Sequence, residues 1–272
     1  MATRTAGIAL LFIAVATAIG FVIDLILSGM SGLFGLNGIV FFSLLFFLLS
    51  LLLSAAVHLY ATGIIIRRYH AKSSEDKDLN GMVDRMAVNA KIPTPKVYIA
   101  PIDVPNAFAT GRGDKASVCV TEGLLSLNTG EKESVVAHEI RHIANSDTLV
   151  QDFAVVLANI LRYTVVLIPL AIAILKFSLS ERREYRADYY GSRLSGKPAD
   201  MASALGKMSE TARQNPMSGS PAYESIWTID PFKREGLARM FSTHPPTARR
   251  AKRLEDMIHE GMPEPPEATE FD

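Results

Sequence analysis

Apolar residues are concentrated in three blocks of this chain, and the first two predict membrane helices. The first block runs from about residue 7 to 27, the second from about 33 to 66, and the third from about 148 to 179. A helix needs roughly 20 predominantly apolar residues to span a bilayer, and the first two blocks reach that length. The turn between them, residues 28–32, is short and uncharged. We therefore predict a transmembrane helical hairpin over residues 1–66.

Basic residues flank both ends of the predicted hairpin. Arg4 precedes the first block, and Arg67, Arg68 and Lys72 follow the second. Because lysine and arginine are retained on the cytoplasmic side of membrane proteins, both ends of the hairpin are expected in the cytoplasm. The domain that follows is therefore expected on the cytoplasmic side as well.

The residues after the hairpin alternate between helical and extended patterns. Apolar positions recur at helical spacing between residues 75 and 90. Two apolar runs, 96–99 and 118–121, have the composition of strands. Residues 106–111 form a short extended piece between them that ends in glycine.

The last third of the chain predicts two helices and a long loop. A charged helix is expected over 180–194, and a closing helix over 249–258. Residues 211–236 are rich in glycine, proline, serine and asparagine, which is typical of a loop. The tail, 261–272, is rich in proline and glutamate and is expected to be disordered. The pattern predicts a mostly α-helical domain with a small β-sheet over residues 67–260.

Composition excludes some classes of protein. The chain has 28 basic and 28 acidic residues, so its net charge is zero and it lacks the basic excess of a nucleic-acid-binding protein. We expect no nucleic-acid partner. Cys119 is the only cysteine, so the chain can form no internal disulfide.

The strongest chemical signal is the pattern H-E-x-x-H, formed by His138, Glu139 and His142. On a helix, positions i and i+4 share one face, so both imidazoles can reach one zinc ion. Glu139 can then act as the general base for a zinc-activated water molecule. The five-residue pattern alone also occurs in helices whose histidines and glutamate simply face solvent. The apolar residues 135–137 favour a buried active-site helix instead.

A catalytic zinc ion needs a third protein ligand and one open position. Glu184 is the best candidate, and Asp188 lies one helical turn later. One carboxylate of such a pair can bind zinc, while the other holds a ligand histidine by its distal nitrogen. The alternative is an ordinary charged helix, because three arginines lie nearby.

This ligand set constrains the third apolar block. His142 and Glu184 must lie on the same side of the membrane, so the block between them crosses an even number of times or not at all. Its length is marginal for two spans, and Arg162 and Pro169 interrupt it. We expect residues 148–179 to form two helical arms that lie on or dip into the membrane, or a buried helix pair inside the domain.

Several segments together resemble the HtpX-type membrane metallopeptidases, which are relatives of the CaaX prenyl endopeptidases. The similarity covers residues 5–260. It is carried by the active-site helix and by four further motifs: residues 138–147, 106–111, 120–125, 183–188 and 241–246.

The resemblance implies an α+β zincin-like domain with one zinc ion per chain, bound by His138, His142 and Glu184, and Glu139 as the catalytic base. It implies that Asp188 supports a ligand histidine. It also implies that Asn106, Ala107, Phe108 and Ala109 form an edge strand along which an extended substrate lies.

His244 is expected near the cleft, where we predict that it helps to stabilise the oxyanion. A turn residue before two prolines is the alternative reading of His244. Arg250 is expected to form a structural ion pair.

These inferences predict a membrane-anchored zinc endopeptidase of the cell (inner) membrane. Its substrates would be membrane or misfolded polypeptides, cleaved on the cytoplasmic side during protein quality control. One alternative is a catalytically silent membrane scaffold that binds zinc for stability. Another is an intramembrane protease, but the polar residues that closely flank the motif favour a domain exposed to water.

Overall fold

A computed structural model describes residues 35–161, 181–217, 226–232 and 244–259. The chain divides into two compact units, Met1–Ala61 and Thr62–Asp272. Helix α2 (Gly35–Arg68) begins in the first unit and ends in the second. The catalytic motif and every candidate site residue belong to the second unit.

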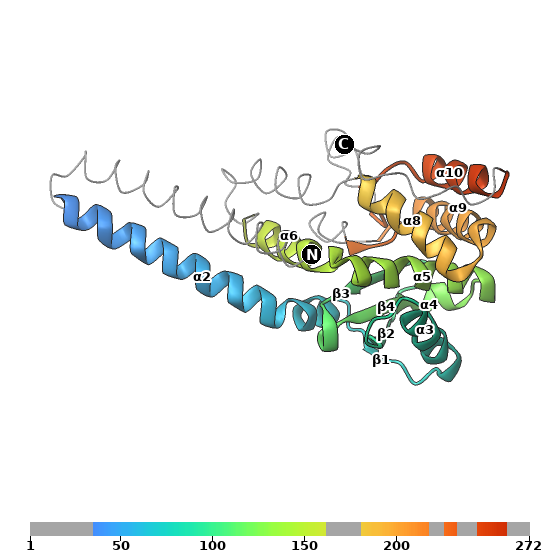
Figure 1. The fold of residues 1–272 in the computed structure, drawn as a ribbon, viewed down its shortest axis with the longest axis horizontal. Helices are drawn as coiled ribbons and strands as arrows, with labels where there is room; N and C mark the ends of the chain where they lie inside the picture. The colour runs from blue at the N-terminus through green and yellow to red at the C-terminus, as the bar shows by residue number, and fades with distance from the viewer. Residues whose placement is uncertain (1–34, 162–180, 218–225, 233–243, 260–272) are drawn as a thin grey trace. The chain divides into compact units, whose positions relative to one another are not determined.

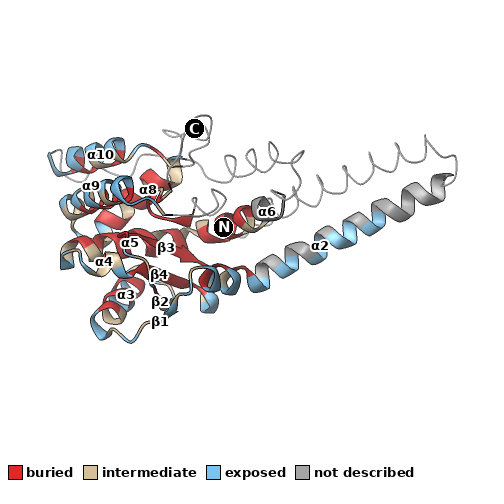
Figure 2. Ribbon diagram, turned by 180° about the vertical axis from the view of Figure 1, so that it is seen from behind, coloured by how far each residue is buried: buried red, intermediate tan, exposed pale blue. Residues whose placement is uncertain are grey.

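The predicted hairpin is described only in part. Its first arm lies outside the described residues, and α2 covers the second arm. Large apolar residues of α2, such as Leu48 and Leu52, are exposed. Figure 2 shows several stretches of this helix in the colour of exposed residues. Within the described ranges, however, none of the helices is long and apolar enough to cross a membrane. The transmembrane hairpin therefore stays a prediction.

The second unit contains a four-stranded sheet with the order β1-β2-β4-β3. Strand β2 pairs parallel with β4, whereas β1 and β3 pair antiparallel with their neighbours. The strands are β1 (Lys72–Ser73), β2 (Lys96–Ala100), β3 (Ala107–Thr110) and β4 (Ser117–Thr121). Strand β3 is thus the last strand of the sheet, in line with the edge strand that the resemblance implies for Asn106 to Ala109.

Helix α5 (Thr129–Asn145) lies between the sheet and helices α8 and α9 (Figure 1). The other helical elements of the described part are α3 (Lys77–Asn89), η1 (Gly113–Lys115), α4 (Glu122–Leu125), α6 (Asp147–Leu161), α8 (Glu181–Ser195), α9 (Pro198–Gln214) and α10 (Thr247–His259). Buried side chains of α3, α5, α8, α9, α10 and the sheet form one apolar core.

Local sequence determines where α5 begins and ends. Asn128 caps the helix by accepting a bond from the Glu131 amide, and the Glu131 side chain bonds back to the Asn128 amide. This capping box satisfies two amides that have no partner within the helix. At the other end, Ser146 adopts a left-handed conformation with φ 61°, and Asp147 starts α6. The chain therefore turns directly after the H-E-x-x-H motif.

The predicted helices over 75–90, 180–194 and 249–258 are confirmed as α3, α8 and α10 within a few residues. The predicted loop begins too early, because α9 continues to Gln214. Within the third apolar block, α6 covers the first part up to Leu161, and residues 162–180 lie outside the described ranges. The tail at 261–272 lies outside them as well.

Candidate metal centre

The two histidines of the motif lie side by side on α5. His138 and His142 are buried, with 1% and 3% of their surface exposed. Their Nε2 atoms are 3.1 Å apart. The spacing of one helical turn therefore brings both rings to one point, as the sequence predicts.

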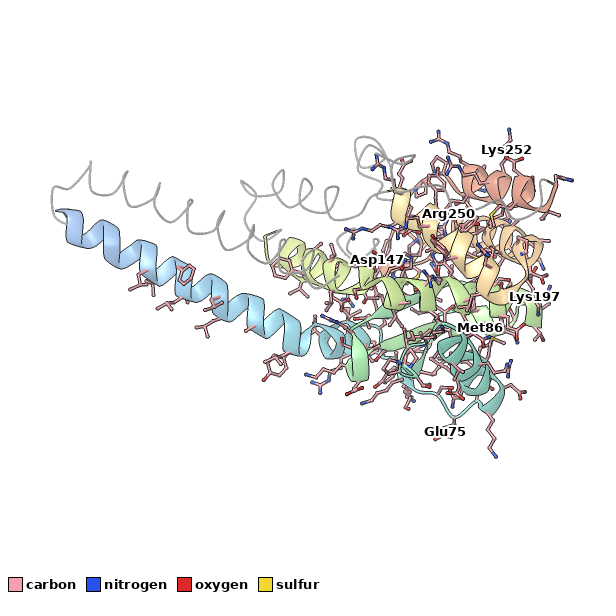
Figure 3. All side chains as sticks on the ribbon, in the orientation of Figure 1. Glu75, Met86, Asp147, Lys197, Arg250 and Lys252 are labelled. Carbon is pink, nitrogen blue, oxygen red and sulfur yellow. The ribbon has the colours of Figure 1, made fainter. Side chains whose placement is uncertain are left out.

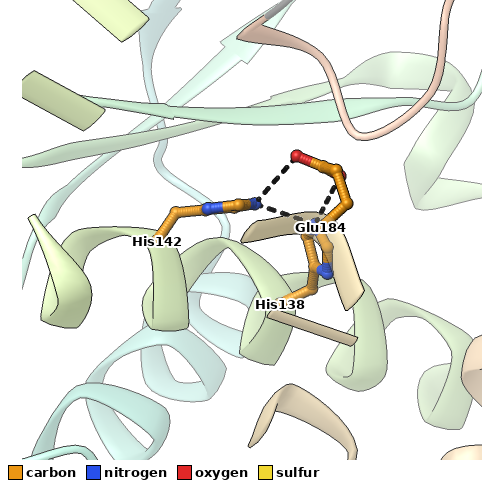
Figure 4. A group of neighbouring side chains, drawn as sticks. All are labelled: His138, His142 and Glu184. Carbon is orange, nitrogen blue, oxygen red and sulfur yellow. Dashed lines mark hydrogen bonds and ion pairs between the residues drawn. The ribbon is translucent and has the colours of Figure 1, made fainter. Parts of the chain in front are cut away.

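Glu184 reaches this point from α8 (Figure 4). Its Oε1 lies 3.6 Å from Nε2 of His142, and its Oε2 lies 3.7 Å from Nε2 of His138. Ligand atoms around a tetrahedral zinc ion are separated by roughly 3.3 Å, because each lies about 2.0 Å from the metal. The three side chains, one ligand atom from each, therefore form a group that can hold a metal ion, and nitrogen and oxygen donors suit zinc.

A glycine allows α8 to approach α5 closely enough for this contact. Gly191 lies seven residues after Glu184 and therefore on the same face of α8. A Cβ atom on Gly191 would lie 2.9 Å from both Cα and N of His138. The backbone of α8 therefore packs directly against the backbone of His138.

Replacing Gly191 by alanine is expected to separate the two helices and to weaken metal binding. Overpacking of this kind costs about 1–3 kcal/mol of stability. Gly206 on α9 is a matched control, because a Cβ atom there would meet nothing within 4 Å. The midpoint temperature of thermal unfolding and the zinc affinity should both fall for Gly191→Ala. Neither should fall for Gly206→Ala. If the two variants have the same unfolding midpoint and zinc affinity, Gly191 is not needed for the close approach of α8 to α5.

Asp188 lies beside the first histidine, and its predicted role in supporting that ring stays a prediction. Its Oδ1 lies 3.0 Å from Nδ1 of His138. Burial alone would lower the pKa of His138, but the neighbouring carboxylates Asp188 and Glu184 raise it to about 9. A metal ion that binds His138 near neutral pH must therefore displace a proton from it.

Arg250 completes this network from α10 and confirms the predicted ion pair. It is buried, and it binds both oxygens of Asp188 at 2.7 and 2.8 Å. Its Nη1 also lies 3.2 Å from Oε2 of Glu184. Figure 3 draws the side chains as sticks and labels Arg250.

These contacts keep both carboxylates ionised. Burial opposes the charged form of Glu184, but the neighbouring imidazoles of His138 and His244 and the charge of Arg250 hold its pKa well below the ordinary value. Burial likewise opposes the charged form of Asp188, and the charge of Arg250 is the main cause of its lowered pKa. Glu184 is therefore negatively charged, as a metal ligand must be.

Sequence reasoning missed the partner of the second histidine. Nδ1 of His142 lies 3.3 Å from Oδ2 of Asp147, the first residue of α6. Asp147 is part of the run that carries the family resemblance, but the helical pattern gives no reason to expect contact across the left-handed turn at Ser146. Each histidine of the motif thus has its own neighbouring carboxylate.

The predicted base, Glu139, is buried with 1% of its surface exposed. Its Oε1 accepts a hydrogen bond from the hydroxyl of Thr228 at 2.7 Å. Sequence reasoning did not single out Thr228, which lies in the predicted loop.

His244 lies at the metal group. Its Nδ1 is 3.6 Å from Oε2 of Glu184, and its side chain is 7% exposed. The structure therefore brings together His138, His142, Glu184, Asp188 and His244. A role of His244 in stabilising the oxyanion stays a prediction.

The predicted substrate strand, Asn106 to Ala109, is buried. One edge of β3 pairs with β4, and the segment 226–232 lies along its other edge. The amide of Thr228 donates to the carbonyl of Ala107 at 2.9 Å, and Phe108 is bridged to Trp227. Binding of a substrate along this strand stays a prediction.

Comparison with known proteins shows what this chain is similar to. The pattern of peptidase family M48 matches residues 73–258. A protease HtpX homolog from Pyrococcus abyssi is 40% identical over 242 residues, which cover 76% of this chain and 84% of the relative. One from Gemmatimonas aurantiaca is 35% identical over 245 residues, 76% of this chain and 88% of the relative.

The crystal structure of S. mikatae Ste24p is similar in fold. It has a TM-score of 0.51 at 19% sequence identity, and the match covers 93% of this chain and 66% of that chain.

Proposed function

Because the chain belongs to peptidase family M48, we propose that it is a membrane-anchored zinc endopeptidase that cleaves membrane or misfolded polypeptides on the cytoplasmic side. One observation carries the proposal. A buried glutamate, Glu139, follows the first histidine of a group that can bind metal, and it is not itself part of that group. A site that binds zinc only for stability has no need of such a residue.

Each residue of the site has its own role in the proposed hydrolysis of a peptide bond. His138, His142 and Glu184 would hold zinc, which supplies a Lewis acid and lowers the pKa of water toward neutrality when bound. Glu139 takes a proton from the attacking water molecule and passes it to the leaving amine. His244 donates a hydrogen bond to the oxyanion that forms on the scissile carbonyl carbon. Asp188 and Asp147 hold the ligand histidines in orientation.

The membrane anchor and the substrate strand are parts of the same proposal. The apolar sequence of residues 7–66 and the exposed apolar side chains of α2 support attachment to a bilayer. For Asn106 to Ala109, the support is their place at the last strand of the sheet, where an extended polypeptide can add through backbone hydrogen bonds. The Thr228 amide occupies the Ala107 carbonyl on this edge, so a substrate would pair with the edge beyond that contact.

The substrate class can be tested with a reporter protein that is either unfolded or held folded. The purified chain would be placed in lipid vesicles with a membrane-tethered reporter whose soluble segment is either unfolded or locked by a tight ligand. We expect zinc-dependent cleavage of the unfolded form and little cleavage of the locked form. If zinc is bound and neither form is cut, the alternative of a silent zinc-binding scaffold is favoured.

A further inference from the structure

The hydroxyl group of Thr228 faces the proposed catalytic base. Its Oγ1 is 2.7 Å from Oε1 of Glu139 and 3.0 Å from the carbonyl oxygen of Ala107. A threonine hydroxyl has one hydrogen to donate. The Ala107 carbonyl already accepts the amide of Thr228, and a carboxylate is the stronger acceptor. The hydroxyl therefore donates to Glu139.

The backbone of Thr228 is held from two sides. Its amide donates to Ala107 on β3 at 2.9 Å. Its carbonyl oxygen accepts from Nη1 of Arg250 at 2.6 Å. The same arginine holds Asp188 and lies close to Glu184. Thr228 is thus fixed to the sheet and to the residues that support the metal ligands.

The flanking residues anchor the segment further. Trp227 is 1% exposed, and its ring lies edge-on against Phe108 and Tyr69, with ring centres 4.8 Å apart in both pairs. Its indole nitrogen donates to the hydroxyl of Tyr69 at 3.1 Å. The side-chain amide of Asn106 donates to the carbonyl of Ile229 at 3.0 Å. These contacts leave the Thr228 hydroxyl little freedom to move.

We propose that Thr228 is a positioning residue for the reaction: its hydroxyl holds Oε1 of Glu139, so that Oε2 is presented to the attacking water molecule. The proposal rests on the proposed function, in which Glu139 is the base. A glutamate side chain has three rotatable bonds, and a base must stay within hydrogen-bond reach of the proton it takes. Thr228 restricts that motion without touching the substrate.

Three substitutions separate positioning from simple packing. Thr228→Val keeps the shape and removes the hydroxyl, whereas Thr228→Ser keeps the hydroxyl. Thr110→Val is the matched control, because Thr110 is also buried on β3 and donates to a buried carboxylate, that of Asp152, at 2.8 Å. The fall in kcat of Thr110→Val measures the effect of removing a buried threonine hydroxyl that does not contact Glu139.

We expect Thr228→Val to lower kcat about tenfold to a hundredfold, the size of effect that misplacement of a reacting group produces. KM and the amount of bound zinc should stay unchanged, Thr228→Ser should restore most of kcat, and Thr110→Val should change kcat by less than about threefold. Failure of serine to restore kcat, or an equal loss in Thr110→Val, would overturn the proposal.

A second readout does not depend on activity. The unfolding midpoint of the metal-free full chain would be measured for Thr228→Val, Glu139→Ala and the double variant. The hydrogen bond predicts that Thr228→Val lowers the midpoint less when Glu139 is already absent. If the changes in the midpoint for the two single variants simply add in the double variant, the two side chains do not interact and the proposal is wrong. If the wild-type chain cuts no reporter while this coupling is present, the proposed function fails and the contact itself stands.

Discussion

Replacing Glu139 by glutamine is expected to lower reporter cleavage by about a hundredfold to ten-thousandfold, the contribution that a general base makes. Glutamine has the same shape, and its carbonyl oxygen can still accept the hydrogen bond from Thr228. It cannot take a proton from water. Zinc binding should be unchanged, because Glu139 is not in the group formed by His138, His142 and Glu184. The measurements are kcat/KM and the zinc content of the same samples.

Glu133 provides a matched control on the same helix. Its carboxylate pairs with Arg85 and Lys197, away from the histidines. Glu133→Gln should keep cleavage within about threefold, since it removes only partly exposed ion pairs. If Glu139→Gln keeps more than a tenth of the wild-type rate, another group is the base and the assignment of Glu139 is wrong.

Replacing Arg250 by methionine is expected to destabilise the second unit by about 3–5 kcal/mol, because it leaves a buried charge without its partner. The carboxylate of Asp188 would lose both of its bonds to the guanidinium group, and the carbonyl of Thr228 would lose its donor. The metal ligands depend on the same network, so zinc affinity should fall as well. Denaturant unfolding and zinc titration of the full chain measure the two effects.

The neighbouring Arg249 is the control. Its side chain is 62% exposed, and its ion pair with Glu181 is long, at 3.8 Å. Arg249→Met should change the free energy of unfolding by no more than roughly 0.5 kcal/mol, as is usual for surface positions. Similar losses in the two variants would show that the buried network does not stabilise the site.

Each half of the candidate metal group could be predicted from the sequence because each half is local. Two histidines one turn apart must share a face of α5, and the same rule places Glu184 and Asp188 on one face of α8. Periodicity also predicts α3 and α10. Helix α9 was not predicted, although its buried residues have helical spacing.

Other parts of the site depend on contacts between distant residues. Thr228 and Glu139 are 89 positions apart, and threonine in a polar segment carries no signature of a site. The role of Gly191 depends on how closely two helices pack, which no single segment encodes. Asp147 is near His142 in sequence, but its contact depends on the left-handed turn at Ser146. Side-chain chemistry was therefore easier to predict than the contacts that orient it.

We propose that one zinc ion, held by His138, His142 and Glu184, is required for peptide cleavage. The most direct test is a titration of the metal-free chain with zinc, in which bound metal and the rate of cleavage of an unfolded reporter are measured together. We predict that the rate rises in proportion to bound zinc and reaches its maximum at one ion per chain, and that Glu184→Ala needs far more zinc to reach any activity. Cleavage by the metal-free chain, or full activity of Glu184→Ala at the same zinc concentration, would contradict the claim.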